Sequence, residues 1–179
     1  MKVEDLIKEK AAKIKLLILD VDGVLTNGRI TMNERGEEVK SFNVKDGFGL
    51  KMLMSAGIEV VIITGRQSIV VAHRARELGI KEVCQGVTDK REVCRRLIDK
   101  KGLVKLEVCC IGDDLPDLSM FVEAGLRIAV ADAVKEVREE ADFVTRKKGG
   151  YGAVREACEL LLKSQGAWPR IGFTEQSAD

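Results

Sequence analysis

The sequence lacks any cluster of histidines and cysteines that could bind a soft metal. It contains one histidine, His73, whose position in a helical pattern indicates a half-exposed helix residue. The cysteines show no metal-ligand spacing, so the sequence argues against a zinc site. We expect all five to be reduced, small and mostly buried. They are Cys84, Cys94, Cys109, Cys110 and Cys158.

An excess of one charge and long apolar runs are also missing. The 30 basic and 29 acidic residues give a formal net charge of +1, and no basic stripe is interleaved with aromatics. This composition argues against a nucleic-acid partner. No apolar stretch approaches the roughly 20 residues that span a bilayer, and the charged residues 1–14 lack the apolar centre of a signal peptide. We therefore expect a cytoplasmic protein with no membrane partner.

Apolar runs alternate with helix-like segments along the 179 residues. Strands are expected at 15–20, 57–63, 81–84, 106–111, 126–130 and 143–144, and helices at 46–56, 67–78, 88–101, 115–124, 134–140 and 151–164. This alternation predicts an α/β fold in which helices cover both faces of a parallel sheet. A small β-hairpin is expected over residues 28–43, around a short loop that contains glycine.

We expect a single domain over residues 1–164, because the length suits one domain and the hairpin is too small to be a second. The tail over residues 165–179 has no periodicity but contains Trp168, Ile171 and Phe173. Such a tail is either disordered or docked on another surface.

The most informative motif is the Asp20-Val21-Asp22-Gly23 sequence, which directly follows the apolar run at 15–19. Gly23 ends the predicted strand, so both acids lie at the carboxyl edge of the sheet, where open α/β folds bind ligands. Carboxylates this close repel each other unless a cation or a shared proton offsets the charge. A solvated acidic turn is the alternative for this motif alone.

Three more predicted strand ends carry polar motifs. They are Thr64-Gly65-Arg66, Lys90 at the start of a helix, and the run from Gly112 to Asp117 that includes Asp113 and Asp114. Each alone has an ordinary interpretation as a turn, a solvated lysine or a helix cap. In a parallel sheet all of them meet the first motif at one edge, which favours a single site.

Phosphoryl transfer is the chemistry that this set of residues suits. Asp20 can attack phosphorus to form an aspartyl-phosphate, and Lys90 can offset the charge of the phosphate. Carboxylates are ligands that Mg²⁺ prefers, and Asp20 and Asp113 can hold the ion. The Thr64 hydroxyl and the Gly65 amide can bind phosphate oxygens, and Asp22 can act as general acid and then base.

The four motifs, in this order, resemble the phosphatase branch of the haloacid dehalogenase superfamily. The resemblance implies a Rossmann-like sheet, a Mg²⁺ cofactor and an aspartyl-phosphate on Asp20. It also implies that Asp20, the Asp22 backbone carbonyl and Asp113 bind the metal, while Asp114 and Asp117 support them. Thr64 and Lys90 complete the catalytic set.

Only about 40 residues separate Asp22 from Thr64, which leaves no room for a sizeable cap domain. A capless enzyme needs another lid, and a neighbouring subunit can supply one. The chain resembles the capless 3-deoxy-D-manno-octulosonate 8-phosphate phosphatases over nearly its full length. The matching stretches are residues 20–28, 42–49, 63–66, 74–80 and 149–156.

That resemblance implies a phosphatase of lipopolysaccharide precursor synthesis, assembled as a homotetramer through its hairpins, with active sites shared between subunits. Arg74 would reach a neighbour's site, and basic side chains suit an acidic sugar phosphate. Its substrate contacts would be Asp22, Asn43, Val44, Lys45, Asp46, Gly47, Lys51, Thr64, Gly65, Arg66, Arg74 and Lys90. The run from Gly149 to Gly152 is either a loop that starts the last helix or a flexible segment that helps product leave.

Three alternatives remain. A related branch acts on a nine-carbon acidic sugar 9-phosphate, but it tends to have glutamate where Arg66 stands. A phosphoaspartate receiver domain also combines acids, threonine and lysine on a parallel sheet, although it is shorter and has its acidic pair in a different order. A catalytically silent scaffold that assembles through the hairpin is the third alternative.

Overall fold

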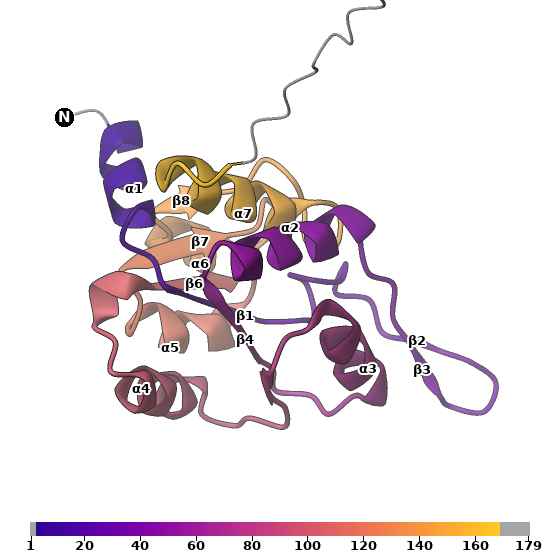
Figure 1. Ribbon diagram of the computed structural model, residues 1–179. Coiled ribbons are helices and arrows are strands. Elements are labelled where there is room, and N and C mark those ends of the chain that lie inside the picture. Colours follow the sequence, from indigo (N-terminus) through magenta and orange to yellow (C-terminus); the bar gives the residue numbers. More distant parts are fainter. Residues whose placement is uncertain (1–2, 169–179) are drawn as a thin grey trace, which may run out of the picture.

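The computed structural model describes residues 3–168, and its centre is one six-stranded sheet (Figure 1). The strand order is β5-β4-β1-β6-β7-β8, and every neighbouring pair is parallel. The predicted α/β fold is confirmed. The strands are β1 (Leu16–Leu19), β4 (Glu59–Ile63), β5 (Glu82–Cys84), β6 (Val108–Gly112), β7 (Leu126–Ala129) and β8 (Phe143–Val144).

Helices cover both faces of this sheet. One face carries α1, α2 and α7, which pack together, and the other carries α4 and α5 (Figure 1). Among the described residues, no helix is long and apolar enough to cross a membrane. The helices are α1 (Val3–Ala11), α2 (Val44–Ser55), α3 (Ile69–Leu78), α4 (Lys90–Lys101), α5 (Leu118–Phe121), α6 (Lys135–Glu140) and α7 (Ala153–Ser164).

Capping side chains decide where three of these helices begin. Asn43, Ser68 and Asp89 each accept a hydrogen bond from a backbone N–H in the first turn of α2, α3 and α4. Such caps satisfy amides that have no partner inside the helix. As a result, α2 begins two residues earlier than the sequence pattern predicted, and α3 and α4 begin two residues later.

Most predicted elements are one or two residues shorter than expected, and 3₁₀ turns replace part of two of them. The strand predicted at 106–111 begins only at Val108, because a 3₁₀ turn, η1 (Lys105–Glu107), precedes it and the Glu107 side chain closes that turn. The helix predicted at 115–124 is divided into a 3₁₀ turn, η2 (Leu115–Asp117), and the short α5. The Asp114 and Asp117 side chains accept hydrogen bonds from nearby backbone amides and so tighten this start.

The predicted hairpin is present as β2 (Thr31–Met32) paired with β3 (Glu38–Val39) in antiparallel register. It projects from the body of the molecule (Figure 1). Asn33 closes its loop by accepting hydrogen bonds from the amides of Arg35 and Glu37.

The core contains β1 and β6, which are buried along their whole length. All five cysteines are free and four are buried, as expected, while Cys84 is half-buried. His73 is exposed on α3. Trp168 packs on the core between Arg155 and Lys163. The rest of the predicted tail, with Ile171 and Phe173, lies outside the described residues.

The strand order determines where a ligand can bind. From β1 the chain runs to β4 and β5 on one side, and later to β6, β7 and β8 on the other. Ligands of open α/β sheets bind beyond the carboxyl ends of the strands at such a reversal. The loops that follow β1 and β6 therefore flank the expected site.

Candidate active site

Asp20 and Lys90 form a buried ion pair at the carboxyl edge of the sheet. Asp20 directly follows β1, and Lys90 is the first residue of α4. The Lys90 Nζ atom lies 2.9 Å from Asp20 Oδ1 and 2.7 Å from Asp117 Oδ1. Burial acts to lower the pKa of Lys90, but the charges of Asp117 and Asp20 outweigh it and raise that pKa. Lys90 therefore remains a cation between two carboxylates.

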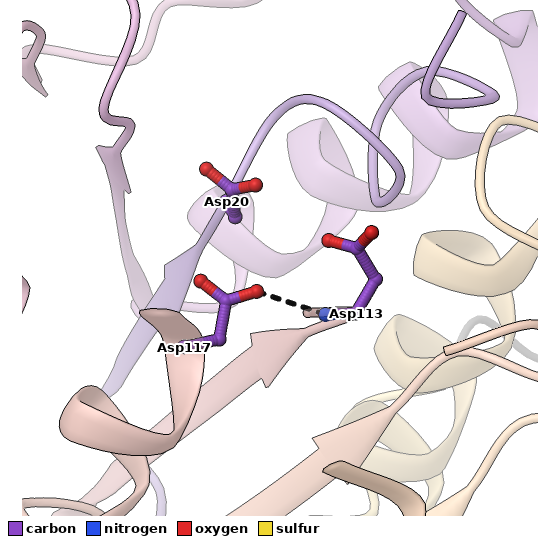
Figure 2. A group of neighbouring side chains, drawn as sticks. All are labelled: Asp20, Asp113 and Asp117. Carbon is purple, nitrogen blue, oxygen red and sulfur yellow. Dashed lines mark hydrogen bonds between the residues drawn. The ribbon is translucent and has the colours of Figure 1, made fainter. Parts of the chain in front are cut away.

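The segment after β6 supplies Asp117 and a third carboxylate, that of Asp113. Figure 2 shows Asp113 at the end of the neighbouring strand and Asp117 on the helical turn that follows, both beside Asp20. Oxygen atoms of the three side chains lie within 4.8 Å of one another. Asp117 Oδ2 accepts hydrogen bonds from the amides of Asp113, at 2.9 Å, and Asp114, at 3.3 Å. Both oxygens of Asp117 are therefore engaged by the protein.

Asp113 differs from Asp117 because one of its oxygens has no partner. Within residues 3–168, Asp113 Oδ1 is the only buried side-chain oxygen or nitrogen without a hydrogen bond. Buried polar atoms are normally paired, so an unpaired carboxylate oxygen suits a ligand that is not part of the chain.

The charges of the cluster also favour a cation. Burial, followed by repulsion from Asp117 and Asp20, raises the pKa of Asp113 to about 8. Burial and the charge of Asp117 raise the pKa of Asp20 to about 6, although Lys90 opposes both effects. Three carboxylates face a single lysine, and oxygen donors of this kind suit Mg²⁺. The donor set therefore fits the predicted cofactor.

Asp22 lies beside this cluster and faces the hairpin. Its Oδ1 atom pairs with the Nζ atom of Lys40, the residue that follows β3, and its Oδ2 atom lies 3.7 Å from the Nε atom of Arg66. Lys40 also pairs with Glu38, at 3.1 Å. The Asp22 carboxylate is thus part of an ion-pair network rather than of the acidic cluster.

Our sequence reasoning missed Lys40 and Glu38. A pattern that could have indicated them is their spacing of two residues, which places both side chains on one face of a strand. Glu38 accepts hydrogen bonds from Arg66, at 3.1 Å, and from Ser68. The Ser68 hydroxyl, with help from Lys40 and Arg66, lowers the pKa of Glu38 despite the opposing effect of burial.

Thr64 follows β4 at the same edge of the sheet, as predicted. Its side chain is buried, and its backbone pairs with Cys84 and Val87. Gly65 and Arg66 come next and are exposed. This backbone pairing holds the start of the Thr64-Gly65-Arg66 turn in place.

The predicted substrate contacts at the start of α2 fall into two groups. Val44, Lys45 and Lys51 are exposed and free to meet a ligand. Asn43 instead uses its side chain as the helix cap, accepting from the amide of Lys45 at 2.8 Å. Asp46 turns inward and accepts from the amides at the start of α7, which the structure shows as an anchor between two helices.

Arg74 lies against the start of α2 of its own chain. Its guanidinium is 5.7 Å from the ring centroid of Phe42, and its Nη1 atom is 2.8 Å from Glu77. A Cβ atom on Gly47 would come within 2.4 Å of Arg74 Nη2. These contacts of Arg74 are with residues that do not belong to the acidic cluster.

The Gly149-Gly150 segment packs against the loop after Asp20. The Gly150 amide donates to Val24, and a Cβ atom on Gly149 would come within 1.6 Å of the Gly23 carbonyl oxygen. This contact places the segment that leads into α7 directly beside the candidate site.

The chain is similar to curated and solved phosphatases over most of its length. Residues 78–157 match the haloacid dehalogenase-like hydrolase family. The 3-deoxy-D-manno-octulosonate 8-phosphate phosphatase KdsC of Escherichia coli K12 is 48% identical over 157 residues, which cover 88% of this chain and 84% of that protein.

Solved structures agree with this likeness. The 3-deoxy-D-manno-octulosonate 8-phosphate phosphatase of Yersinia pestis matches with a TM-score of 0.89 and 45% identity, covering 91% of this chain and 88% of that one. The enzyme of that name from Moraxella catarrhalis, in complex with magnesium, phosphate and KDO, matches with a TM-score of 0.88 and 47% identity. That match covers 90% of this chain and 93% of the other.

These relatives favour neither the receiver-domain hypothesis nor the nine-carbon alternative. Sequence identities of 48% and 45%, over 88% and 91% of this chain, are far higher than a shared fold alone requires. The chain belongs to the haloacid dehalogenase superfamily, in its family of 3-deoxy-D-manno-octulosonate 8-phosphate phosphatases.

Proposed function

We propose that this protein is a Mg²⁺-dependent phosphatase of lipopolysaccharide precursor synthesis. It hydrolyses 3-deoxy-D-manno-octulosonate 8-phosphate to 3-deoxy-D-manno-octulosonate and phosphate. The observation that carries the proposal is the pairing of Asp20 with Lys90 beside the unpaired Asp113 oxygen. Relatives that bear this activity in their names support the choice of substrate.

In the first half of the reaction, Asp20 attacks phosphorus. A bond forms between an Asp20 oxygen and phosphorus while the bond from phosphorus to the sugar oxygen breaks, and Asp22 gives its proton to that oxygen. The Lys90 ammonium offsets charge on the transferring group. Thr64 and Gly65 bind the phosphate oxygens and hold them in line with Asp20.

In the second half, water attacks the aspartyl-phosphate and Asp22 takes the proton from that water. Free phosphate leaves and Asp20 is restored. When bound, Mg²⁺ offsets the negative charge that gathers on the phosphoryl oxygens. Asp20, the Asp22 carbonyl and Asp113 would hold the ion, and Asp117 and Asp114 would keep the Asp113 loop in place.

The sugar acid needs cations beyond the phosphate site. Lys45, Lys51 and Arg66 are exposed near the hairpin and α2, where they can pair with a carboxylate. Asn43, Val44 and Gly47 provide the neighbouring surface. This group of residues makes an acidic sugar phosphate a better substrate than a neutral hexose phosphate.

We also propose a cytoplasmic homotetramer with shared active sites. The hairpin exposes Ile30, Met32 and Val39, which are 59%, 59% and 48% accessible. Apolar side chains gathered on a projecting hairpin suit burial against another subunit. A neighbour's surface would then exclude water from a site that has no cap domain, and Arg74 would contribute to it.

Phosphate release from a panel of esters tests this function. We expect Mg²⁺-dependent turnover of the eight-carbon acidic sugar phosphate, slower turnover of the nine-carbon analogue, and little on neutral hexose phosphates. Asp20→Asn should abolish turnover and leave the fold and assembly intact. Equal rates on all esters would contradict the proposed substrate, and full activity of Asp20→Asn would contradict the nucleophile.

A further inference from the structure

Lys40 is a buried cation that none of the four sequence motifs contains. Its side chain is only 1% exposed, and its Nζ atom pairs with Asp22 Oδ1 and with Glu38 Oε1. Burying an ammonium group is costly unless it is paired. Lys40 is therefore held firmly in this place by its two carboxylate partners.

Asp22 depends on Lys40 for its orientation. Across residues 3–168, Lys40 is the one residue that donates a hydrogen bond to the Asp22 carboxylate. The nearest other cation atom, Arg66 Nε, lies 3.7 Å from Asp22 Oδ2, and the Asp22 side chain is 21% exposed. Without Lys40, the longer contact to Arg66 is what the described residues would leave to hold this carboxylate.

Glu38 ties Lys40 to the body of the molecule. Its Oε1 atom pairs with both Lys40 and Arg66, and its Oε2 atom accepts a hydrogen bond from Ser68. Ser68 caps α3 and its amide donates to Gln85, at 2.7 Å. The hairpin therefore reaches its own active site through Glu38 and Lys40, in addition to any contact with another subunit.

We propose that Lys40 is a positioning residue that acts through Asp22, an inference that rests on the proposed function. Its hydrogen bond to Asp22 Oδ1 leaves Oδ2 to carry the proton and aims that oxygen at the ester oxygen of the substrate. When Asp20 forms its bond to phosphorus, this proton passes to the departing sugar alkoxide. Glu38 maintains the geometry by holding Lys40 against Asp22.

Two esters with different leaving groups test this role. A sugar alkoxide needs a proton as it leaves, whereas 4-nitrophenolate is stable as an anion. For Lys40→Met we expect kcat/KM to fall by about 10- to 100-fold on 3-deoxy-D-manno-octulosonate 8-phosphate, since a misplaced catalytic group costs about that much. On 4-nitrophenyl phosphate the fall should be much smaller. Lys13→Met, which removes an exposed partner of Glu9, should change neither value.

A double-mutant cycle makes the test specific to Asp22. Asp22→Asn should show the same preferential loss on the sugar ester, and adding Lys40→Met to it should cause no further preferential loss. Equal losses on the two esters, additive effects in the cycle, or a raised KM with unchanged kcat would each overturn the inference.

Lys40→Arg covers the case in which Lys40→Met does not fold. It keeps the charge but moves the donor atoms, so the sugar ester should again lose more than the aryl ester, by a smaller factor. Equal losses for Lys40→Arg would also overturn the inference. Failure of the proposed function is a separate result, because the wild-type protein would then not turn over the sugar ester at all.

Discussion

The backbone of Gly23 lies directly against the carboxylate of Asp113. A Cβ atom on Gly23 would come within 1.9 Å of Asp113 Oδ2, and Gly23 has a φ of +96°. The loop after β1 can approach the loop after β6 only because residue 23 has no side chain. This contact sets how closely Asp20 and Asp113 can share a metal ion.

Gly23→Ala should therefore weaken metal binding in addition to lowering stability. We expect a loss of about 1–2 kcal/mol from the left-handed backbone and a 10- to 100-fold weaker Mg²⁺ affinity, of the order seen for altered support of metal ligands. Gly57→Ala is a matched control, with a φ of +88° and no atom within 4 Å of its Cβ. Titration calorimetry and urea unfolding measure the two effects, and equal Mg²⁺ affinities in both variants would contradict this prediction.

Asp113 should make the metal-free protein less stable as the pH rises. Burial and repulsion from Asp117 and Asp20 raise its pKa to about 8 in the folded state, above the ordinary 3.8. Between these two values the folded state binds more protons than the unfolded state, so stability falls with increasing pH, by at most about 1.4 kcal/mol per unit from this group.

Asp113→Asn should reduce that slope and be more stable than the wild type at pH 8 in the presence of EDTA. Mg²⁺ should stabilise the wild type and leave Asp113→Asn almost unchanged. Urea unfolding at pH 5 and pH 8 measures both effects, with Asp99→Asn on the exposed face of α4 as the control. Identical pH slopes for the three proteins would contradict the assigned cause.

Asp46 should contribute to stability rather than to substrate affinity. Its two oxygens accept from the amides of Gly152, at 3.2 Å, and Arg155, at 2.7 Å, and so join α2 to α7. Asp46→Ala should lower the free energy of unfolding by about 1–2 kcal/mol and leave KM almost unchanged. A raised KM with unchanged stability would instead support the substrate contact predicted from the sequence.

Arg74 should act on a neighbouring subunit if the proposed assembly is correct. We expect Arg74→Ala and Asp20→Asn each to be inactive alone. Mixed assemblies should recover about a quarter of wild-type activity, because a site with its own Asp20 can receive Arg74 from its neighbour in a symmetric oligomer. Mixing the two proteins after mild dissociation and measuring phosphate release checks this. If no activity returns, Arg74 serves only its own chain.

Helix starts show what the sequence pattern could not predict. The apolar periodicity places α2, α3 and α4 correctly, but their first residues depend on which of Asn43, Ser68 and Asp89 actually accepts an amide. The same limit applies near Asp117, where hydrogen bonds to the Asp113 and Asp114 amides replace a regular first helical turn. Local hydrogen bonding of this kind is not visible in hydrophobic periodicity.

The roles of the polar residues divide in a similar way. Lys90 could be expected beside Asp20, because Asp20 follows one parallel strand and Lys90 starts the helix that follows another. Both positions lie at the carboxyl edge of the sheet. Asp46 could not be recognised as a helix anchor, because its partners at the start of α7 are more than 100 residues away in the sequence.

The sequence by itself determined that Asp20, Thr64, Lys90 and Asp113 would share one edge of the sheet, because parallel strands joined by helices all end at the same edge. Only the tertiary structure decided which carboxylate oxygen lacks a partner and which cation faces Asp22. Lys40 reaches Asp22 because the chain that returns from the projecting hairpin passes beside the loop after β1, and no local pattern in the chain specifies that long-range contact.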